Sequence, residues 1–204
     1  MKNKVLPFRF DEIDDNIYAG FWPRLGALLL DFIILIPYII LLHSLNGLSI
    51  LMYQIVLIPN LIFIIWFNVY LVKRYGGTPG KLIVGLKVIN KNGDDISLNG
   101  AILRYIVSIG LAIFGAIVLI LILQNADDNV YQSLGFWKRN TYIVGLNPKL
   151  IKQVSLLNNI WIYSELIILL TNKRKRSIHD FMANTVVIKS KYHNKIKDIL
   201  NISN

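Results

Sequence analysis

The sequence lacks cysteine altogether and has few charged residues for its length. Without cysteine the chain can form no disulfide, no thiolate metal site and no cysteine nucleophile. Charged residues make up 17% of its 204 residues and apolar residues make up 54%, whereas a typical soluble domain has about 25% charged residues. This deficit of charge indicates a membrane protein.

A cleavable signal peptide is also not evident. Such a peptide begins with a basic segment and continues with a short apolar core, but the first eighteen residues are polar and include four acidic side chains, Asp11, Glu12, Asp14 and Asp15. The first apolar block is too long for a signal-peptide core. We therefore expect a retained membrane anchor that follows an N-terminal tail at residues 1–18.

Long apolar runs, by contrast, occur four times. They cover residues 19–42, 50–72, 100–123 and 154–170, and about 20 apolar residues suffice for a helix to cross a bilayer. The fourth run is the shortest, and a re-entrant or tightly packed helix is the alternative to a span there. The pattern predicts an all-α membrane protein with a four-helix transmembrane bundle over residues 19–171.

The basic residues indicate the orientation of these helices. If both termini are inside, sixteen basic residues lie in the inner segments and four in the outer loop, residues 124–153. Cytoplasmic loops carry an excess of Lys and Arg, so we expect a multi-pass protein of the cell membrane with both termini cytoplasmic. We expect the outer loop to lie on the outer leaflet.

The loop at residues 73–99 predicts a small cytoplasmic β-hairpin. Gly76 is placed to end the second helix, and residues 78–80 are expected to form a turn. Asn92-Gly93 is expected to join the two strands of the hairpin.

The C-terminal segment, residues 172–204, predicts further structure on the same side. Ser177 is a candidate N-cap for a short helix. Residues 185–189, "TVVIK", are rich in β-branched side chains and could add a third strand, with Val187 near Val88, to make a small sheet. The basic run at residues 173–176 predicts contact with anionic lipid.

Two charged residues in the first apolar run need an explanation. Arg24 and Asp31 are seven residues apart, which places them on one helix face, but a direct ion pair between them would be long. An aspartate at the centre of a membrane helix costs about 2.5–3.5 kcal/mol. Asp31 is therefore either an ion or proton site, or a structural residue that locks this helix to its neighbours, and the sequence does not decide between the two.

Other polar residues lie in or near the expected helices. Asn60 could complete a polar site with Asp31, and Glu165 needs a role or a partner within the fourth helix. Arg104 is placed to snorkel at the cytoplasmic end of the third helix. Asp180, next to His179, is expected to pair with a basic group, either Arg24 or Arg104.

The residues give no support for catalysis or for a cofactor. A serine–histidine–acid arrangement, an HExxH motif and a hydrolytic carboxylate pair are all missing, and Gly80 and Gly85 do not have phosphate-loop spacing. His179 and Asp180 alone are too few ligands for a metal. The net charge is +10. The basic residues flank the apolar runs, which favours the lipid bilayer over nucleic acid as the partner. We expect neither an enzyme nor a cofactor-binding protein.

Three segments together resemble the RDD family of small bacterial integral membrane proteins. They are "AGFWPRLGALLLDFIIL", "GGTPGKLIVGLKVINKNGDDISL" with the following "LRY", and "SIHDFMANTVVIK". The resemblance implies that Arg24, Asp31 and Asp180 are the arginine and two aspartates that name the family, and that Arg104 is its basic residue at the start of the third helix. Asn184 stands where the family usually has glycine, which a helix end with positive φ tolerates.

Two functions remain open at this point. The resemblance implies transport of a small solute or a monovalent cation against protons, with Asp31 as the ion site and Arg24 favouring its ionised form. Four helices make a small transporter, so this hypothesis predicts a homo-oligomer. The alternative is a non-transporting module that anchors, assembles or regulates a partner in another membrane complex, with Arg24, Asp31 and Asp180 as a structural clamp.

Overall fold

The computed structural model describes residues 6–7 and 16–200, apart from the side chain of Phe136. Most of the N-terminal tail expected at residues 1–18, including its four acidic side chains, therefore lies outside the described residues. The chain divides into two compact units. Unit 1 comprises residues 1–34, 66–106 and 162–204, and unit 2 comprises residues 35–65 and 107–161.

Four helical segments are long and apolar enough to cross a membrane, as the sequence predicts. They are α1 (Phe21–Asn46), the segment Ile50–Ile83 that begins with α2 (Ile50–Ile65), α5 (Leu98–Leu123) and α8 (Pro148–Thr171). The 24 residues of α8 correspond to about 36 Å of helix, which is enough to span. Its start at Pro148, ahead of the expected residue 154, reflects the suitability of proline for a first helical turn.

The second segment changes character toward its C-terminal end. A π-helical turn at Trp66–Tyr70 is followed by α3 (Leu71–Tyr75), which ends at Gly76 with a φ of 82°, as expected. The turn expected at residues 78–80 is wrong, because α4 (Pro79–Ile83) begins there with proline in its first turn. Threonine followed by proline is a helix-start signal, and here it starts a helix and not an isolated turn.

Unit 1 contains a two-stranded antiparallel sheet of β1 (Leu86–Asn90) and β2 (Thr185–Lys189). Val88 lies opposite Val187, so the predicted pairing of these two segments is confirmed. The hairpin expected within residues 73–99 is reduced to one bridge, from Ile89 to Asp95. Tyr18 forms a bridge with β2, so the chain just before α1 joins the sheet.

Short helices complete unit 1. Ser177 caps α9 (Ile178–Met182), as predicted, and η2 (Ser190–Tyr192) and α10 (His193–Ile199) follow β2. Asn184 has a φ of 52°, the conformation that the sequence anticipates. A compact core forms from side chains of the pre-helical chain, both strands and α10: Leu6, Ile17, Tyr18, Ile89, Val186, Ile188 and Ile196.

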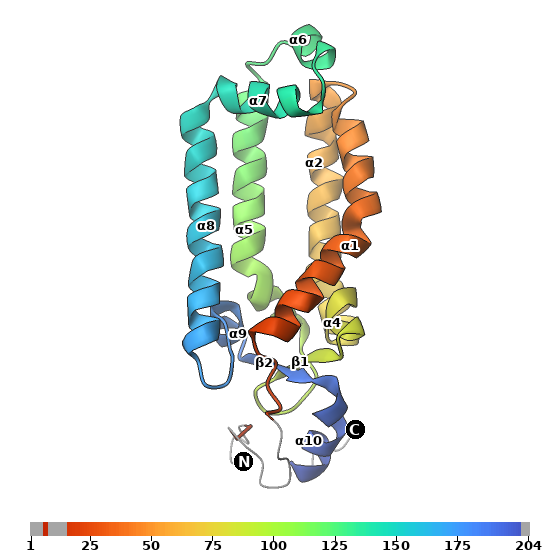
Figure 1. Ribbon diagram of the computed structural model, residues 1–204, viewed down its shortest axis with the longest axis vertical. Coiled ribbons are helices and arrows are strands. Elements are labelled where there is room, and N and C mark those ends of the chain that lie inside the picture. The colour runs from red at the N-terminus through yellow and green to blue at the C-terminus, as the bar shows by residue number, and fades with distance from the viewer. Residues whose placement is uncertain (1–5, 8–15, 201–204) are drawn as a thin grey trace. The chain divides into compact units, whose positions relative to one another are not determined.

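Unit 2 contains the connection between α5 and α8, which is folded into two further helices. They are α6 (Asp128–Ser133) and α7 (Phe136–Leu146), and α7 runs crosswise to α5 (Figure 1). The side chain of Asp127 caps α6 by accepting from two backbone N–H groups. Tyr131 and Ile143 pack with Ile50 and the last turns of α5 in a second core. The expected position of this connection on the outer leaflet stays a prediction.

Candidate functional site

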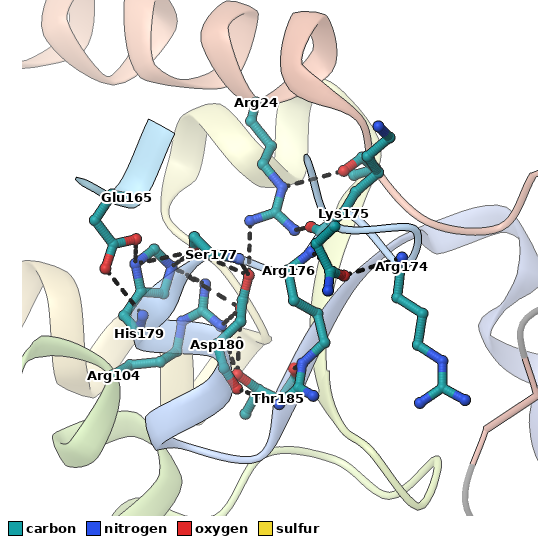
Figure 2. Close-up of polar contacts among 12 residues, drawn as sticks. Arg24, Arg104, Glu165, Arg174, Lys175, Arg176, Ser177, His179, Asp180 and Thr185 are labelled. Carbon is teal, nitrogen blue, oxygen red and sulfur yellow. Dashed lines mark hydrogen bonds and ion pairs between the residues drawn. The ribbon is translucent and has the colours of Figure 1, made fainter. Parts of the chain in front are cut away.

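Asp180 lies at the centre of a charge cluster in unit 1 (Figure 2). It is fully buried in the first turn of α9, where its carboxylate accepts from the backbone N–H of Ser177 at 3.1 Å. Nη1 of Arg24 donates to Oδ2 at 2.8 Å, and Nη1 of Arg104 donates to Oδ1. The sequence suggested one arginine or the other, and the structure pairs Asp180 with both.

Arg24 connects the start of α1 to the segment that precedes α9. Its Nε donates to the carbonyl of Ala19 at 3.1 Å, and Nη2 donates to the carbonyl of Lys175 at 2.5 Å. Lys175 has a φ of 51°, which turns the chain between α8 and α9. Together with the ion pair to Asp180, these contacts engage every nitrogen of the guanidinium group.

Arg104 brings α5 to the same point from a different element (Figure 2). Its side chain is 1% exposed, so it does not snorkel to water as expected. Nη1 also donates to the hydroxyl of Thr185 in β2 at 2.6 Å, and Nη2 lies 2.9 Å from Nε2 of His179. The guanidinium thus joins α5 to α9 and to the sheet.

The electrostatics of Asp180 follow from these two neighbours. Burial alone would raise the pKa of the Asp180 carboxyl, but the guanidinium groups of Arg104 and Arg24 outweigh it and hold the pKa well below its usual range. The side chain is therefore a carboxylate at neutral pH. A buried carboxylate between two guanidinium groups is favourable only while all three are present.

Glu165 and His179 extend the cluster toward α8. The backbone N–H of His179 donates to Oε1 of Glu165 at 2.9 Å, and Nδ1 of the ring lies 2.6 Å from Oε2. The second contact is short, but Oε2 forms no hydrogen bond with this ring nitrogen or with any other described residue. Burial and the charge of Arg104 lower the pKa of His179, despite the opposing carboxylates, so we treat the imidazole as neutral and the contact as polar. Glu165 thereby has the partner that the sequence required.

Asp31 does not belong to this cluster and makes a separate contact in unit 1. Its Oδ2 accepts from the hydroxyl of Thr78 at 2.5 Å, and its Oδ1 accepts from the N–H of Gly80 at 2.7 Å. Thr78 precedes α4 without capping it through its own side chain, so a carboxylate from α1 supplies the cap instead. A Cβ on Gly80 would overlap the carbonyl oxygen of Ala27, so α4 can approach α1 this closely because residue 80 is glycine.

Asn60 lies in unit 2, where its side-chain oxygen accepts from the hydroxyl of Tyr38 at 3.1 Å. Both oxygens of Asp31 are engaged within unit 1. The suggested polar site made of Asp31 and Asn60 is therefore not supported by these contacts.

Arg176 is the residue that sequence reasoning misplaced. We assigned it to a lipid-facing basic run, but it is buried. Its Nε donates to the carbonyl of Thr185 at 3.0 Å and its Nη2 to the carbonyl of Asp180 at 2.8 Å, with Phe181 stacked 4.0 Å from the guanidinium. Its place directly before the helix cap Ser177 was a signal that it belongs to the fold of α9 and not to a solvated tail.

The cluster joins α1, α5, α8 and α9 through charged and polar side chains. Two of its atoms, Nε of Arg104 and Oε2 of Glu165, are buried without a hydrogen-bond partner among the described residues. Within residues 6–7 and 16–200, no group of three or more His, Cys, Asp or Glu side chains is placed to hold a metal ion.

Comparison with known proteins places the chain in a family. Uncharacterized protein YckC of Bacillus subtilis (strain 168) is 31% identical over 124 residues, covering 54% of this chain and 78% of that protein. No solved structure matches the chain. The RDD family model matches residues 18–184, a range that contains the first two segments of the resemblance and the third as far as Asn184. The chain therefore belongs to the RDD family.

Proposed function

We propose that this protein is a non-transporting membrane module that anchors, assembles or regulates a partner in another membrane complex. The observation that carries the proposal is that every side-chain nitrogen and oxygen of Arg24, Asp31 and Asp180 takes part in a hydrogen bond within the chain. Residues fixed in this way favour a rigid surface outside the apolar helices over an ion that binds and leaves. The sheet and the short helices of unit 1 would be the partner's binding surface.

Transport of a small solute or a monovalent cation against protons is the second candidate. It would use Glu165 and His179 in place of Asp31, since this pair is partly exposed, with 14% and 26% of the two side chains accessible. An intramembrane carboxylate next to a histidine is a common proton site. This candidate retains the expectation of a homo-oligomer.

Reconstitution separates the two candidates. The purified protein is placed in liposomes with a pH-sensitive dye and challenged with sodium, potassium or lithium gradients. The anchoring proposal expects no cation-dependent pH change beyond that of empty liposomes. Transport expects a change that Glu165→Gln abolishes, and a flux abolished by Asp31→Asn in folded, inserted protein would overturn the structural role of Asp31.

A partner is sought by affinity purification from mildly solubilised membranes. The proposal expects a defined stoichiometric partner with the wild-type protein and its loss with Arg24→Gln, which loosens the attachment of α9 to α1. Lys138→Gln, an exposed change in unit 2, is the matched control. Equal recovery of the same proteins with wild type and Arg24→Gln would argue against unit 1 as the binding surface.

We further propose that both termini are cytoplasmic in the cell membrane and that residues 173–175 contact anionic lipid. The exposed Lys173 and the half-buried Arg174 support the lipid contact, whereas Arg176 does not contribute.

Because the chain contains no cysteine, Ser133→Cys and Ser190→Cys can be labelled singly in intact cells. A thiol reagent that does not cross the membrane should label residue 133 and not residue 190. The opposite labelling pattern would show that the termini lie outside.

A further inference from the structure

A pocket in unit 2 stands apart from all the family residues. Its cavity of about 290 Å³ is lined from the end of α1, from α2, from α6 and from α7. Pockets for small organic ligands start near this volume. The lining includes a guanidinium, an amide and two phenol rings: Arg139, Asn46, Tyr53 and Tyr131.

The walls of the pocket are tied together by hydrogen bonds. Tyr131 is 2% exposed, and its hydroxyl donates to the carbonyl of Asn46 at 2.8 Å. The N–H of Ile50, the first residue of α2, donates to the carboxylate of Asp128 in α6 at 2.8 Å. These bonds hold α6 against the turn between α1 and α2, so the pocket is preformed.

Arg139 presents a positive charge that lacks a carboxylate partner in the part of the chain that the structure describes. Its Nε and Nη2 donate to the backbone carbonyls of Tyr131 and Gln132 at 3.2 and 3.3 Å, and the guanidinium lies 5.3 Å from the centre of the Tyr131 ring. Its Nη1 lies against Gly47, where a Cβ would overlap it. A fixed guanidinium with a remaining N–H donor is suited to a carboxylate.

Asn46 supplies the opposite polarity. Its Oδ1 is buried and has no hydrogen-bond partner among the described residues. A buried acceptor without a donor costs free energy, and a ligand that brings an N–H group would remove that cost.

We propose that this pocket binds a small solute with a carboxylate and an amine, of the α-amino acid class. Arg139 would bind the carboxylate, and the small cavity would limit the size of the side chain. The amide of Asn46, whose Oδ1 is covered by protein in the free structure, would turn so that this oxygen accepts from the ammonium group. The proposal does not depend on whether the protein transports or anchors.

Calorimetric titration of the full chain in lipid nanodiscs tests the proposal. The probes are the common L-amino acids, each alone, with acetate and ethylamine as the two halves of the ligand. We expect at least one amino acid to bind, and to bind at least about tenfold more tightly than either half-ligand. Absence of binding by every amino acid, or acetate binding as tightly as the best amino acid, would overturn the proposal.

Three variants assign the roles of the residues. Arg139→Gln should weaken amino-acid binding at least about tenfold, and Lys138→Gln, an exposed neighbour on the same helix, should leave it unchanged. Arg139 also holds two backbone carbonyls, so its loss alone could report on folding. Asn46→Leu avoids this problem, because it removes an acceptor that is unpaired in the free protein. It should weaken binding while the melting temperature stays the same or rises, and unchanged binding in this variant would refute the assigned role.

Discussion

Asp180 and Asp95 are two aspartates of unit 1 with similar partners and opposite surroundings. Asp180 is shared by two arginines and is 0% exposed. Asp95 is shared by Lys87 at 2.8 Å and Lys197 at 3.1 Å, and its side chain is 54% exposed. Each one ties segments that are distant in the sequence, so the number of ion pairs does not distinguish them.

Burial makes the difference between the two sites. Water can replace the lysines around Asp95, and salt screens the attraction. Water does not reach Asp180, so removal of the carboxylate would leave the guanidinium of Arg104 buried without its counter-charge. The contribution of the family aspartate to stability therefore depends on its burial and not on the number of its ion pairs.

Asp180→Asn should cause the largest loss in the free energy of unfolding. It leaves Arg104 and Arg24 facing a neutral amide, and breaking a buried ion pair costs about 3–5 kcal/mol. Unfolding of the purified protein in a mild detergent, followed by circular dichroism against denaturant, measures the loss. A cost below about 1 kcal/mol would show that the cluster is solvated and that burial is not the deciding factor.

Gly80→Ala should cause the second-largest loss of stability. The added Cβ would overlap the carbonyl oxygen of Ala27 and would lie 2.8 Å from the backbone nitrogen of Asp31. Overpacking of this kind costs about 1–3 kcal/mol. Gly26→Ala in α1 is the matched control, since a Cβ there meets nothing within 4 Å, and alanine in place of a helical glycine stabilises by about 0.5–1 kcal/mol. Equal melting temperatures of the two variants would contradict the close approach of α4 to α1.

Asp31→Asn tests the second family aspartate. An asparagine can keep one acceptor for the N–H of Gly80, but it removes the charge that strengthens both hydrogen bonds, so we expect a loss of about 1–3 kcal/mol. Thr78→Val removes the hydroxyl alone, and a double-mutant cycle between the two changes isolates their coupling. Additive effects would mean that the 2.5 Å contact contributes nothing to stability.

The histidines beside the two sites should make stability depend on pH. Burial and Arg104 lower the pKa of His179, and burial and Lys87 lower that of His193. The folded protein thus binds these protons more weakly than the unfolded chain, so their contribution is complete above a pH of about 6.5 and is lost as the pH falls. His179→Gln should reduce the dependence of the melting temperature on pH between pH 7 and 5 more than His193→Gln does, because Nη2 of the buried Arg104 lies 2.9 Å from the His179 ring.

Much of the fold could be predicted from the sequence, since apolar runs report membrane helices directly. The pairing of Val88 with Val187 followed from β-branched segments on the same predicted side. The partners of Asp31 could not be predicted, because a one-dimensional pattern does not show that α4 would fold back onto α1. Arg176 was misassigned for a related reason: a run of basic residues suggests a solvated surface, and only tertiary packing shows which member is buried.

Asp95→Asn should have the smallest effect of the series, about 0–1 kcal/mol, because an exposed ion pair exchanges readily with water. Partial burial raises the pKa of Asp95, but the hydrogen bonds and charges of Lys87 and Lys197 outweigh it and lower the pKa to about 2. Since the folded pKa is depressed, the contribution is present above a pH of about 4 and is lost as the pH falls toward 2. The melting temperatures of wild type and variant, compared at low and at high salt, measure it. The small difference should vanish in about 1 M salt, where the screening length is about 3 Å. A salt-resistant loss as large as that of Asp180→Asn would show that exposure does not separate the two sites.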